Sequence, residues 1–105
     1  METFYRAIET IRKLETDPET VLALKGAEEF GEFAEAVLRE CGYNSHKSTD
    51  DVGDSFSEGA DVLVCLVAVL ALIHKDESPK EIMSRLFESF GRGMRKYEKI
   101  LNDNR

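Results

Sequence analysis

The chain has 105 residues, with 14 Lys or Arg against 21 Asp or Glu and a net charge of −7. This balance argues against general binding to nucleic acid or to anionic membranes, because both are polyanions. A chain of this length forms one domain, which we place at residues 1–105. Its two cysteines, Cys41 and Cys65, have neither zinc-type spacing nor a disulfide framework. We therefore expect a reducing, cytoplasmic compartment.

Hydrophobic periodicity predicts an all-α protein, a four-helix, bundle-like protomer without strands. The expected helices cover about residues 2–15, 18–41, 55–75 and 79–101. Asp17-Pro18 and Ser78-Pro79 each place a capping residue before a proline suited to the first helical turn. Gly42 is expected to end the second helix. The polar segment from Gly42 to Asp54 is long for a helix connection, and loops of this length are often functional.

The third predicted helix contains 12 consecutive residues without a charge or a polar group other than a thiol, Val62 to Ile73. This run is too short to span a bilayer, so we expect a core helix buried on nearly every side. Two or three neighbours in one small bundle cannot cover every side of such a helix. We therefore expect a homo-oligomer, a dimer or a dimer of dimers, with this helix at or near the subunit interface.

On the second predicted helix, apolar residues at helical spacing define one stripe. Its members are Ala23, Ala27, Phe30, Ala34, Val37 and Cys41. Glu29 and Glu32 fall beside this stripe, whereas Glu28 and Glu35 point further toward solvent. The fourth helix carries Ile82, Leu86, Phe90, Met94, Tyr97 and Leu101 on one face.

Two carboxylate pairs, Glu29/Glu32 and Glu58/Asp61, have i, i+3 spacing, so each pair shares one helix face. Asp61 leads directly into the apolar run, where a buried carboxylate needs a compensating charge. If the two helices pack as an antiparallel hairpin, the pairs face each other. Oxygen ligands at that density suit Mg²⁺, with Mn²⁺ as a possible substitute. An acid pair alone is more often solvated surface, but the two pairs together favour a metal site.

The segment Lys25 to Val37, followed by Glu58 to Leu63, resembles the MazG-like nucleotide pyrophosphohydrolases of the all-α NTP pyrophosphatase superfamily. The family pattern is EExxE, a gap of variable length, and ExxD, and this chain matches it in order and identity. The resemblance implies that Glu29, Glu32, Glu58 and Asp61 are Mg²⁺ ligands, with Glu28 as the remaining acid of the motif.

The resemblance also implies an enzyme that hydrolyses a nucleoside triphosphate between the α and β phosphates, giving the monophosphate and pyrophosphate. Such enzymes remove non-canonical or excess nucleotides. Metal ions would neutralise and clamp the triphosphate and activate a water molecule. A carboxylate that is not fully committed to metal can act as general base, and Glu29 and Glu32 are the candidates.

Substrate contacts are expected from residues that carry charge or an aromatic ring near the motif or on the last helix. The candidates are Lys25, Glu28, Lys47, Arg92, Lys96 and Tyr97. Family members often have a Lys/Asn/Arg-type pattern on the last helix. Residues 88–97 keep the basic side chains and the tyrosine but contain no asparagine, which departs from the family's sugar contacts. Solvated cations near a helix C-terminus are the alternative reading of this cluster.

Two other functions fit the same residues. Phosphoribosyl-ATP pyrophosphohydrolase of histidine biosynthesis also has a Lys-x-x-Glu-Glu-x-x-Glu helix, which Lys25 to Glu32 reproduces, although the gap before Glu58 is longer than usual for that family. A non-catalytic helical interaction module, with surface acids or a structural cation, belongs to a different class.

Overall fold

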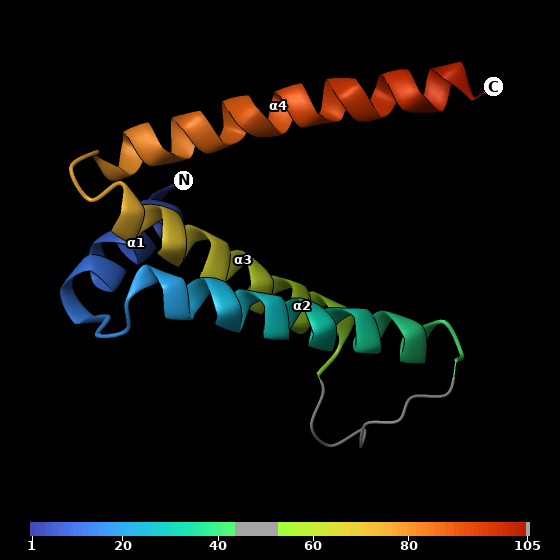
Figure 1. Ribbon diagram of the computed structural model, residues 1–105, viewed down its shortest axis with the longest axis horizontal. Coiled ribbons are helices and arrows are strands. Elements are labelled where there is room, and N and C mark those ends of the chain that lie inside the picture. Colours follow the sequence, from blue (N-terminus) through green and yellow to red (C-terminus); the bar gives the residue numbers. More distant parts are fainter. Residues whose placement is uncertain (44–52, 105) are drawn as a thin grey trace.

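The computed structural model describes residues 1–43 and 53–104. Four helices make up this part of the chain, and it contains no strand (Figure 1). They are α1 (Glu2–Leu14), α2 (Glu19–Glu40), α3 (Ser55–Ile73) and α4 (Pro79–Asp103). The predictions of an all-α protein and of four helices are confirmed, with boundaries that differ by no more than two residues. Lys47, one of the predicted substrate contacts, lies outside the described residues.

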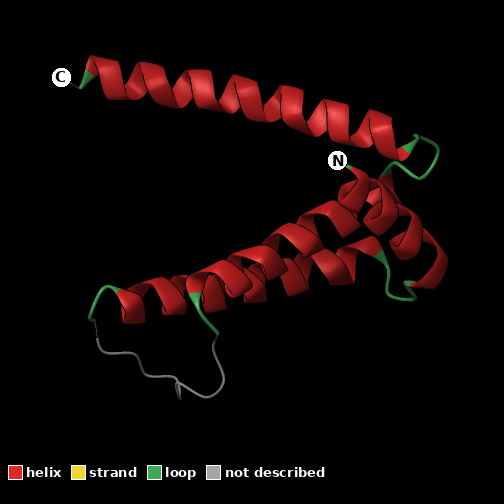
Figure 2. Ribbon diagram, turned by 180° about the vertical axis from the view of Figure 1, so that it is seen from behind, coloured by secondary structure: helices red, strands yellow, loops and turns green. Residues whose placement is uncertain are grey.

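The helices α2 and α3 form an antiparallel hairpin (Figure 1). Helix α1 packs against the end of this hairpin where α3 finishes, and α4 begins there and then leads away (Figure 2). Within the described ranges, α2 and α4 make no contact. The radius of gyration is 16.2 Å, whereas a closed domain of this size has about 13 Å. The four helices therefore do not close into one compact bundle within a single chain.

The hydrophobic core joins α1, α3 and α4. Ile8 and Met83 are its largest fully buried side chains, and Val67, Ala71 and Ile82 complete it. Phe4, Tyr5, Ile11, Leu70 and Leu86 pack around it and are partly buried. This core lies where α1, the C-terminal half of α3 and the start of α4 meet.

Of the helix-end signals in the sequence, those at Ser78 and Gly42 are confirmed and the one at Asp17 is wrong. Ser78 caps α4 with Pro79 in the first turn, as predicted, and Glu81 completes a capping box. Gly42 has φ 88° directly after α2, a conformation that favours glycine. The expected cap at Asp17 is wrong, because Pro18 itself occupies the N-cap position and the Asp17 N–H donates to Glu15 Oε1 at 2.9 Å.

Helix α3 is not buried on nearly every side within one chain, and its burial in a homo-oligomer stays a prediction. Leu63, Val64 and Leu66 are exposed. The helix has 19 residues, because it begins at Ser55. By length and composition the whole helix could cross a membrane, whereas the expectation concerned only its run of 12 apolar residues; core helices of soluble proteins often meet the same criterion.

The predicted apolar stripe of α2 is also wrong. Leu22 and Ala36 are the buried residues, whereas Ala23, Ala27 and Phe30 are exposed. The packed face is set by close approach to α3. A Cβ at Gly26 would lie 3.4 Å from Cys65 Cβ, and one at Gly59 would lie 3.5 Å from the ring of Phe33. The helix is therefore turned so that its Glu29 side faces α3.

Candidate metal centre

Three carboxylates from two helices converge in the hairpin. Oxygens of Glu29, Glu32 and Glu58 all lie within 4.8 Å of one another. Glu29 and Glu32 come from the middle of α2, and Glu58 comes from the first turn of α3. The antiparallel packing of the two helices thus brings three of the four predicted ligands together.

Glu58 is the one buried charged side chain among the described residues, at 7% exposed. Its Oε1 accepts a hydrogen bond from the Gly53 N–H at 2.7 Å. A Cβ at Gly53 would clash with Ser57 Oγ and lie 3.1 Å from Glu58 Oε1, so a glycine allows this close approach. The Arg39 guanidinium donates from Nη2 to the Gly53 carbonyl at 2.7 Å. Gly53 therefore links Glu58 to the end of α2.

The start of α3 is fixed by two further carboxylates. Asp54 caps the helix, with its Oδ1 accepting the Ser57 N–H at 2.8 Å. Glu40 on α2 accepts the Ser55 N–H at 2.8 Å, and the hydrogen bonds from Ser55 hold the pKa of Glu40 below its ordinary value. Sequence reasoning missed this positioning role of Arg39, Glu40 and Gly53, because it depends on where the segment before α3 meets α2.

The carboxylate cluster has acceptors without donors. Glu29 Oε2 and Glu58 Oε2 are buried and have no hydrogen-bond partner among the described residues. Burial raises the pKa of Glu29, and repulsion from Glu32, Asp61 and Glu58 raises it further. Buried ionised oxygens are costly without a donor or a cation, so this arrangement favours cation binding.

Glu35 corrects a second expectation about α2. We expected it to point toward solvent, but it is half-buried, and its Oε1 has no partner in the part of the chain that the structure describes. Glu28, in contrast, is exposed as expected. The rotation of α2 that turns Glu29 toward α3 also turns Glu35 in the same direction.

Asp61 lies one turn beyond Glu58 and does not belong to the group of three. It is exposed, so the expected burial of Asp61 is wrong, and Glu58 is the buried acid instead. Asp61 nevertheless remains close enough for its charge to raise the pKa of Glu29. It also lines a neighbouring cavity together with Glu29.

This cavity lies between α1, α2 and α3 and has a volume of about 320 Å³. Its polar lining comes from Glu15, Lys25, Glu29 and Asp61. Lys25 therefore lies near Glu29, one member of the carboxylate cluster. Nothing in the sequence indicated that Glu15, which follows α1, would line this cavity. Cys65 lies in the wall, and burial raises the pKa of its thiol.

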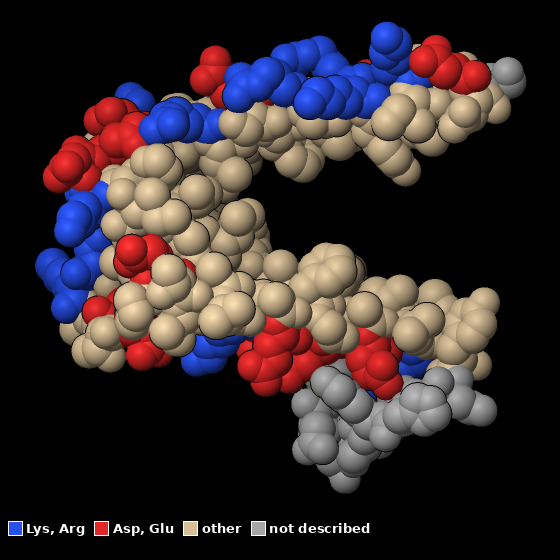
Figure 3. All heavy atoms as spheres, in the orientation of Figure 1, with Lys and Arg blue, Asp and Glu red and all other residues tan. Residues whose placement is uncertain are grey.

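The predicted substrate residues of α4 lie elsewhere in the chain. Arg92, Lys96 and Tyr97 belong to the part of α4 that leads away from the hairpin. In Figure 3 the Lys and Arg side chains of α4 gather on the face that points away from the hollow between α4 and the hairpin, and the acidic side chains of the hairpin gather on the hairpin's face that also points away from it. Arg92 donates to Ser89 Oγ on its own helix at 2.9 Å. Within one chain, the structure does not bring these residues to the carboxylates.

Comparison with protein-family models, with curated proteins and with solved structures finds no match to this chain.

The raised pKa of Glu29 predicts a pH-dependent stability of the metal-free protein. Because the folded state binds this proton more tightly, its contribution is complete below the ordinary pKa of 4.5 and is lost as the pH rises through the folded pKa. We expect Glu29→Gln to raise the free energy of unfolding at pH 7, with a gain that shrinks as the pH falls through the raised folded pKa of Glu29 and is absent below the ordinary pKa of 4.5. Urea unfolding with a chelator at pH 7 and pH 4 measures this difference.

The control is Glu28→Gln, which removes an exposed neighbouring charge on the same helix. It should leave the pH dependence close to that of the unmodified chain. Equal stability of Glu29→Gln and the unmodified chain at pH 7 would contradict the prediction.

Proposed function

We propose that this chain is a Mg²⁺-dependent nucleoside triphosphate pyrophosphohydrolase of the MazG-like kind, which converts an NTP or dNTP and water into the monophosphate and pyrophosphate. The observation that carries the proposal is the buried carboxylate of Glu58. One of its oxygens is held by the Gly53 N–H, and the other has no partner among the described residues. It lies beside Glu29 and Glu32 of another helix.

The residues present fit a hard divalent cation. Oxygens of three carboxylates converge, and two of these carboxylates carry buried oxygens without a donor among the described residues. Mg²⁺ prefers oxygen ligands and keeps positions open for water and phosphate. Glu29, Glu32 and Glu58 would hold the ion, with Asp61 completing the set from the next turn. When bound, Mg²⁺ would offset the charge of the triphosphate and activate water.

The chain's own side chains would bind the phosphate and accept the proton of the attacking water. The cavity of about 320 Å³ beside the cluster is large enough for part of a small ligand. Lys25 lines it and would donate to a phosphate oxygen. Water attacks the α phosphorus, the bond to the bridging oxygen breaks, and pyrophosphate leaves. Glu29 or Glu32 accepts the water proton.

Arg92, Lys96 and Tyr97 are proposed substrate contacts only if a second copy of the chain supplies them. Their distance from the cluster within one chain follows from the lack of contact between α2 and α4 in the described ranges. Glu28 is an exposed acid beside the cluster, and we propose that it contacts substrate rather than metal.

The test is pyrophosphate release from a panel of NTPs, dNTPs and phosphoribosyl-ATP, with Mg²⁺ and with a chelator. We expect Mg²⁺-dependent release from at least one nucleoside triphosphate. Release from phosphoribosyl-ATP alone would assign the protein to histidine biosynthesis instead. No release from any member of the panel would favour a non-catalytic helical module.

The matched variants use acids of the same two helices. Asp61→Ala should abolish release while the circular dichroism of the helices is retained. Glu19→Ala, at the exposed start of α2, should keep full activity. If Asp61→Ala and Glu32→Ala both retain full turnover, the proposed site is wrong.

A further inference from the structure

Gly53, the residue before the N-cap of α3, has both of its backbone polar groups bound by side chains. Arg39 Nη2 donates to its carbonyl oxygen at 2.7 Å, and its N–H donates to Glu58 Oε1 at 2.7 Å. Because Asp54 is the N-cap, Gly53 lies outside the helix. Glycine loses more conformational freedom on folding than any other residue. The orientation of its backbone therefore depends on these two side chains.

The hydrogen bond from Gly53 makes the two carboxylate oxygens of Glu58 different from each other. Oε1 is the acceptor, whereas Oε2 is buried and has no partner among the described residues. The whole residue is only 7% exposed, and one of its oxygens lies within 4.8 Å of oxygens from Glu29 and Glu32. Hydrogen bonds from outside a metal site orient the ligands within it. The N–H of Gly53 is such a group for Glu58.

Arg39 lies in the last turn of α2, the helix that supplies the other two carboxylates of the cluster. Its hydrogen bond to Gly53 joins this helix to the segment that enters α3. Glu40, the next residue, accepts a second N–H group of that segment at 2.8 Å. These contacts set the first turn of α3, and with it Glu58, against α2.

The charge of Arg39, however, opposes cation binding. A guanidinium that is joined to Glu58 through one residue repels a divalent cation held by that carboxylate. The helix dipole gives a separate reason for a cation at this place, because a positive side chain in the last turn of α2 is favourable by itself. Charge and hydrogen bonding therefore predict opposite effects of Arg39 on the affinity for a metal ion.

We infer that Arg39 is a positioning residue for the cation site, and that its hydrogen bond to Gly53 strengthens cation binding by more than its charge weakens it. The bond holds Gly53 so that its N–H engages Glu58 Oε1 and leaves Oε2 for the ion. This inference rests on the cation site of the proposed function, and it does not depend on nucleotide hydrolysis.

The test is titration calorimetry of the full chain with Mn²⁺ in the absence of nucleotide. Arg39→Gln removes the charge and shortens the side chain, and we expect it to weaken Mn²⁺ binding about tenfold, as for other groups that orient metal ligands. By charge alone, the same change would tighten binding. Arg39→Lys keeps the charge and a single donor, so its affinity should lie between those of Arg39→Gln and the unmodified chain.

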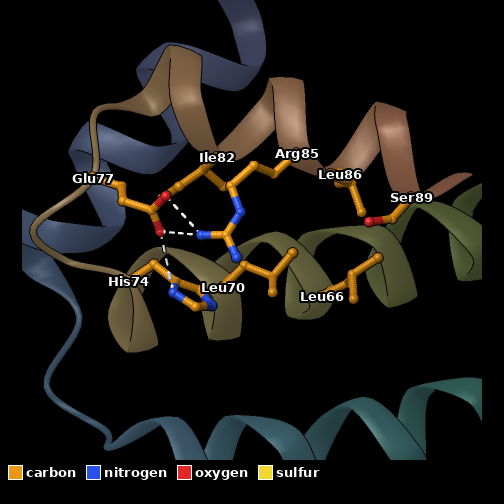
Figure 4. A pocket seen from close by; sticks show the side chains of 8 residues that line it. All are labelled: Leu66, Leu70, His74, Glu77, Ile82, Arg85, Leu86 and Ser89. Carbon is orange, nitrogen blue, oxygen red and sulfur yellow. Dashed lines mark hydrogen bonds and ion pairs between the residues drawn. The ribbon is translucent and has the colours of Figure 1, made fainter.

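Arg85→Gln is the matched control, because it changes the net charge by the same amount at the other end of α3. Figure 4 shows the Arg85 guanidinium bound to the carboxylate of Glu77, which lies 3.2 Å from Nδ1 of His74, the C-cap of α3. Glu58, in contrast, belongs to the first turn of that helix. A charge at this distance is screened, so the Mn²⁺ affinity should stay within about twofold of the unmodified chain.

Two further measurements separate orientation from charge. Gly53→Ala retains every charge but adds a Cβ that would clash with Ser57 Oγ and lie 3.1 Å from Glu58 Oε1. It should weaken Mn²⁺ binding as Arg39→Gln does. In chelator-treated protein, Arg39→Gln should speed amide hydrogen exchange at Gly53 at least about tenfold, because the N–H is then held less firmly against Glu58.

Equal or tighter Mn²⁺ binding by Arg39→Gln would overturn the inference. A variant that melts at a lower temperature but binds Mn²⁺ like the unmodified chain would limit Arg39 to stabilising the end of α2, which overturns it as well. Both results leave the proposed function intact. An unmodified chain that binds no Mn²⁺ would instead refute the proposed cation site, and the inference with it.

Discussion

Replacing Glu58 with Gln is expected to lower Mg²⁺-dependent pyrophosphate release by at least about a hundredfold while the four helices persist. The amide oxygen of the new side chain can still accept the Gly53 N–H, so the start of α3 should be retained. The substitution removes the negative charge at the centre of the cluster and turns an amide toward Glu29 and Glu32. Initial rates and Mn²⁺ titration calorimetry measure the loss.

The control is Glu19→Gln, an exposed acid on α2 outside the cluster. It should leave both the rate and the Mn²⁺ affinity unchanged. A Glu58→Gln variant that binds Mn²⁺ and hydrolyses nucleotides like the unmodified chain would show that the cluster is not the metal site. If the unmodified chain binds Mn²⁺ through Glu58 but hydrolyses nothing, the cluster is a structural cation site.

Replacing Ile8 with Ala is expected to lower the free energy of unfolding by about 2–5 kcal/mol. Ile8 is fully buried and packs with Val67, Ala71, Ile82 and Met83. This cluster is where α1, α3 and α4 are joined, so a cavity there weakens the attachment of α4 as well. The total free energy of unfolding of a domain of this size is about 5–15 kcal/mol. The melting temperature should fall by at least about 10 °C.

Leu14→Ala is the matched control, because Leu14 ends the same helix and is 73% exposed. Its effect should stay within about 0.5 kcal/mol. Both variants are compared with the unmodified chain at one protein concentration, because association would make stability depend on concentration. If both variants lost the same free energy of unfolding, the core would not lie where the structure places it.

The helix boundaries and the helix class were set by local signals in the sequence. Ser78 with Glu81 satisfies two backbone N–H groups at the start of α4, and Gly42 allows the positive φ after α2. The i, i+3 spacing likewise places Glu29 beside Glu32 on any helix. These features involve residues a few positions apart, so the sequence alone predicts them.

The face that α2 presents to α3 was decided only by tertiary packing. Alanines on several sides of the helix made the expected stripe ambiguous, because small apolar residues suit either packing or exposure. The contacts of Gly26 with Cys65 and of Gly59 with Phe33 depend on how closely two helices approach. That approach places Glu29 in the packed face and leaves Glu35 half-buried.

Tertiary packing also decided that Glu58, and not Asp61, is the buried acid. Their sequence contexts favoured Asp61, which adjoins the apolar run, but burial depends on where α2 crosses α3. Arg12 donates to the Ala71 and His74 carbonyls, 59 and 62 positions away, and so joins α1 to the end of α3, after which α4 begins. Composition determined that α3 and α4 carry more apolar surface than one chain covers. Only these long-range contacts determined which part of that surface stays exposed, because they fix how the helices are placed relative to one another.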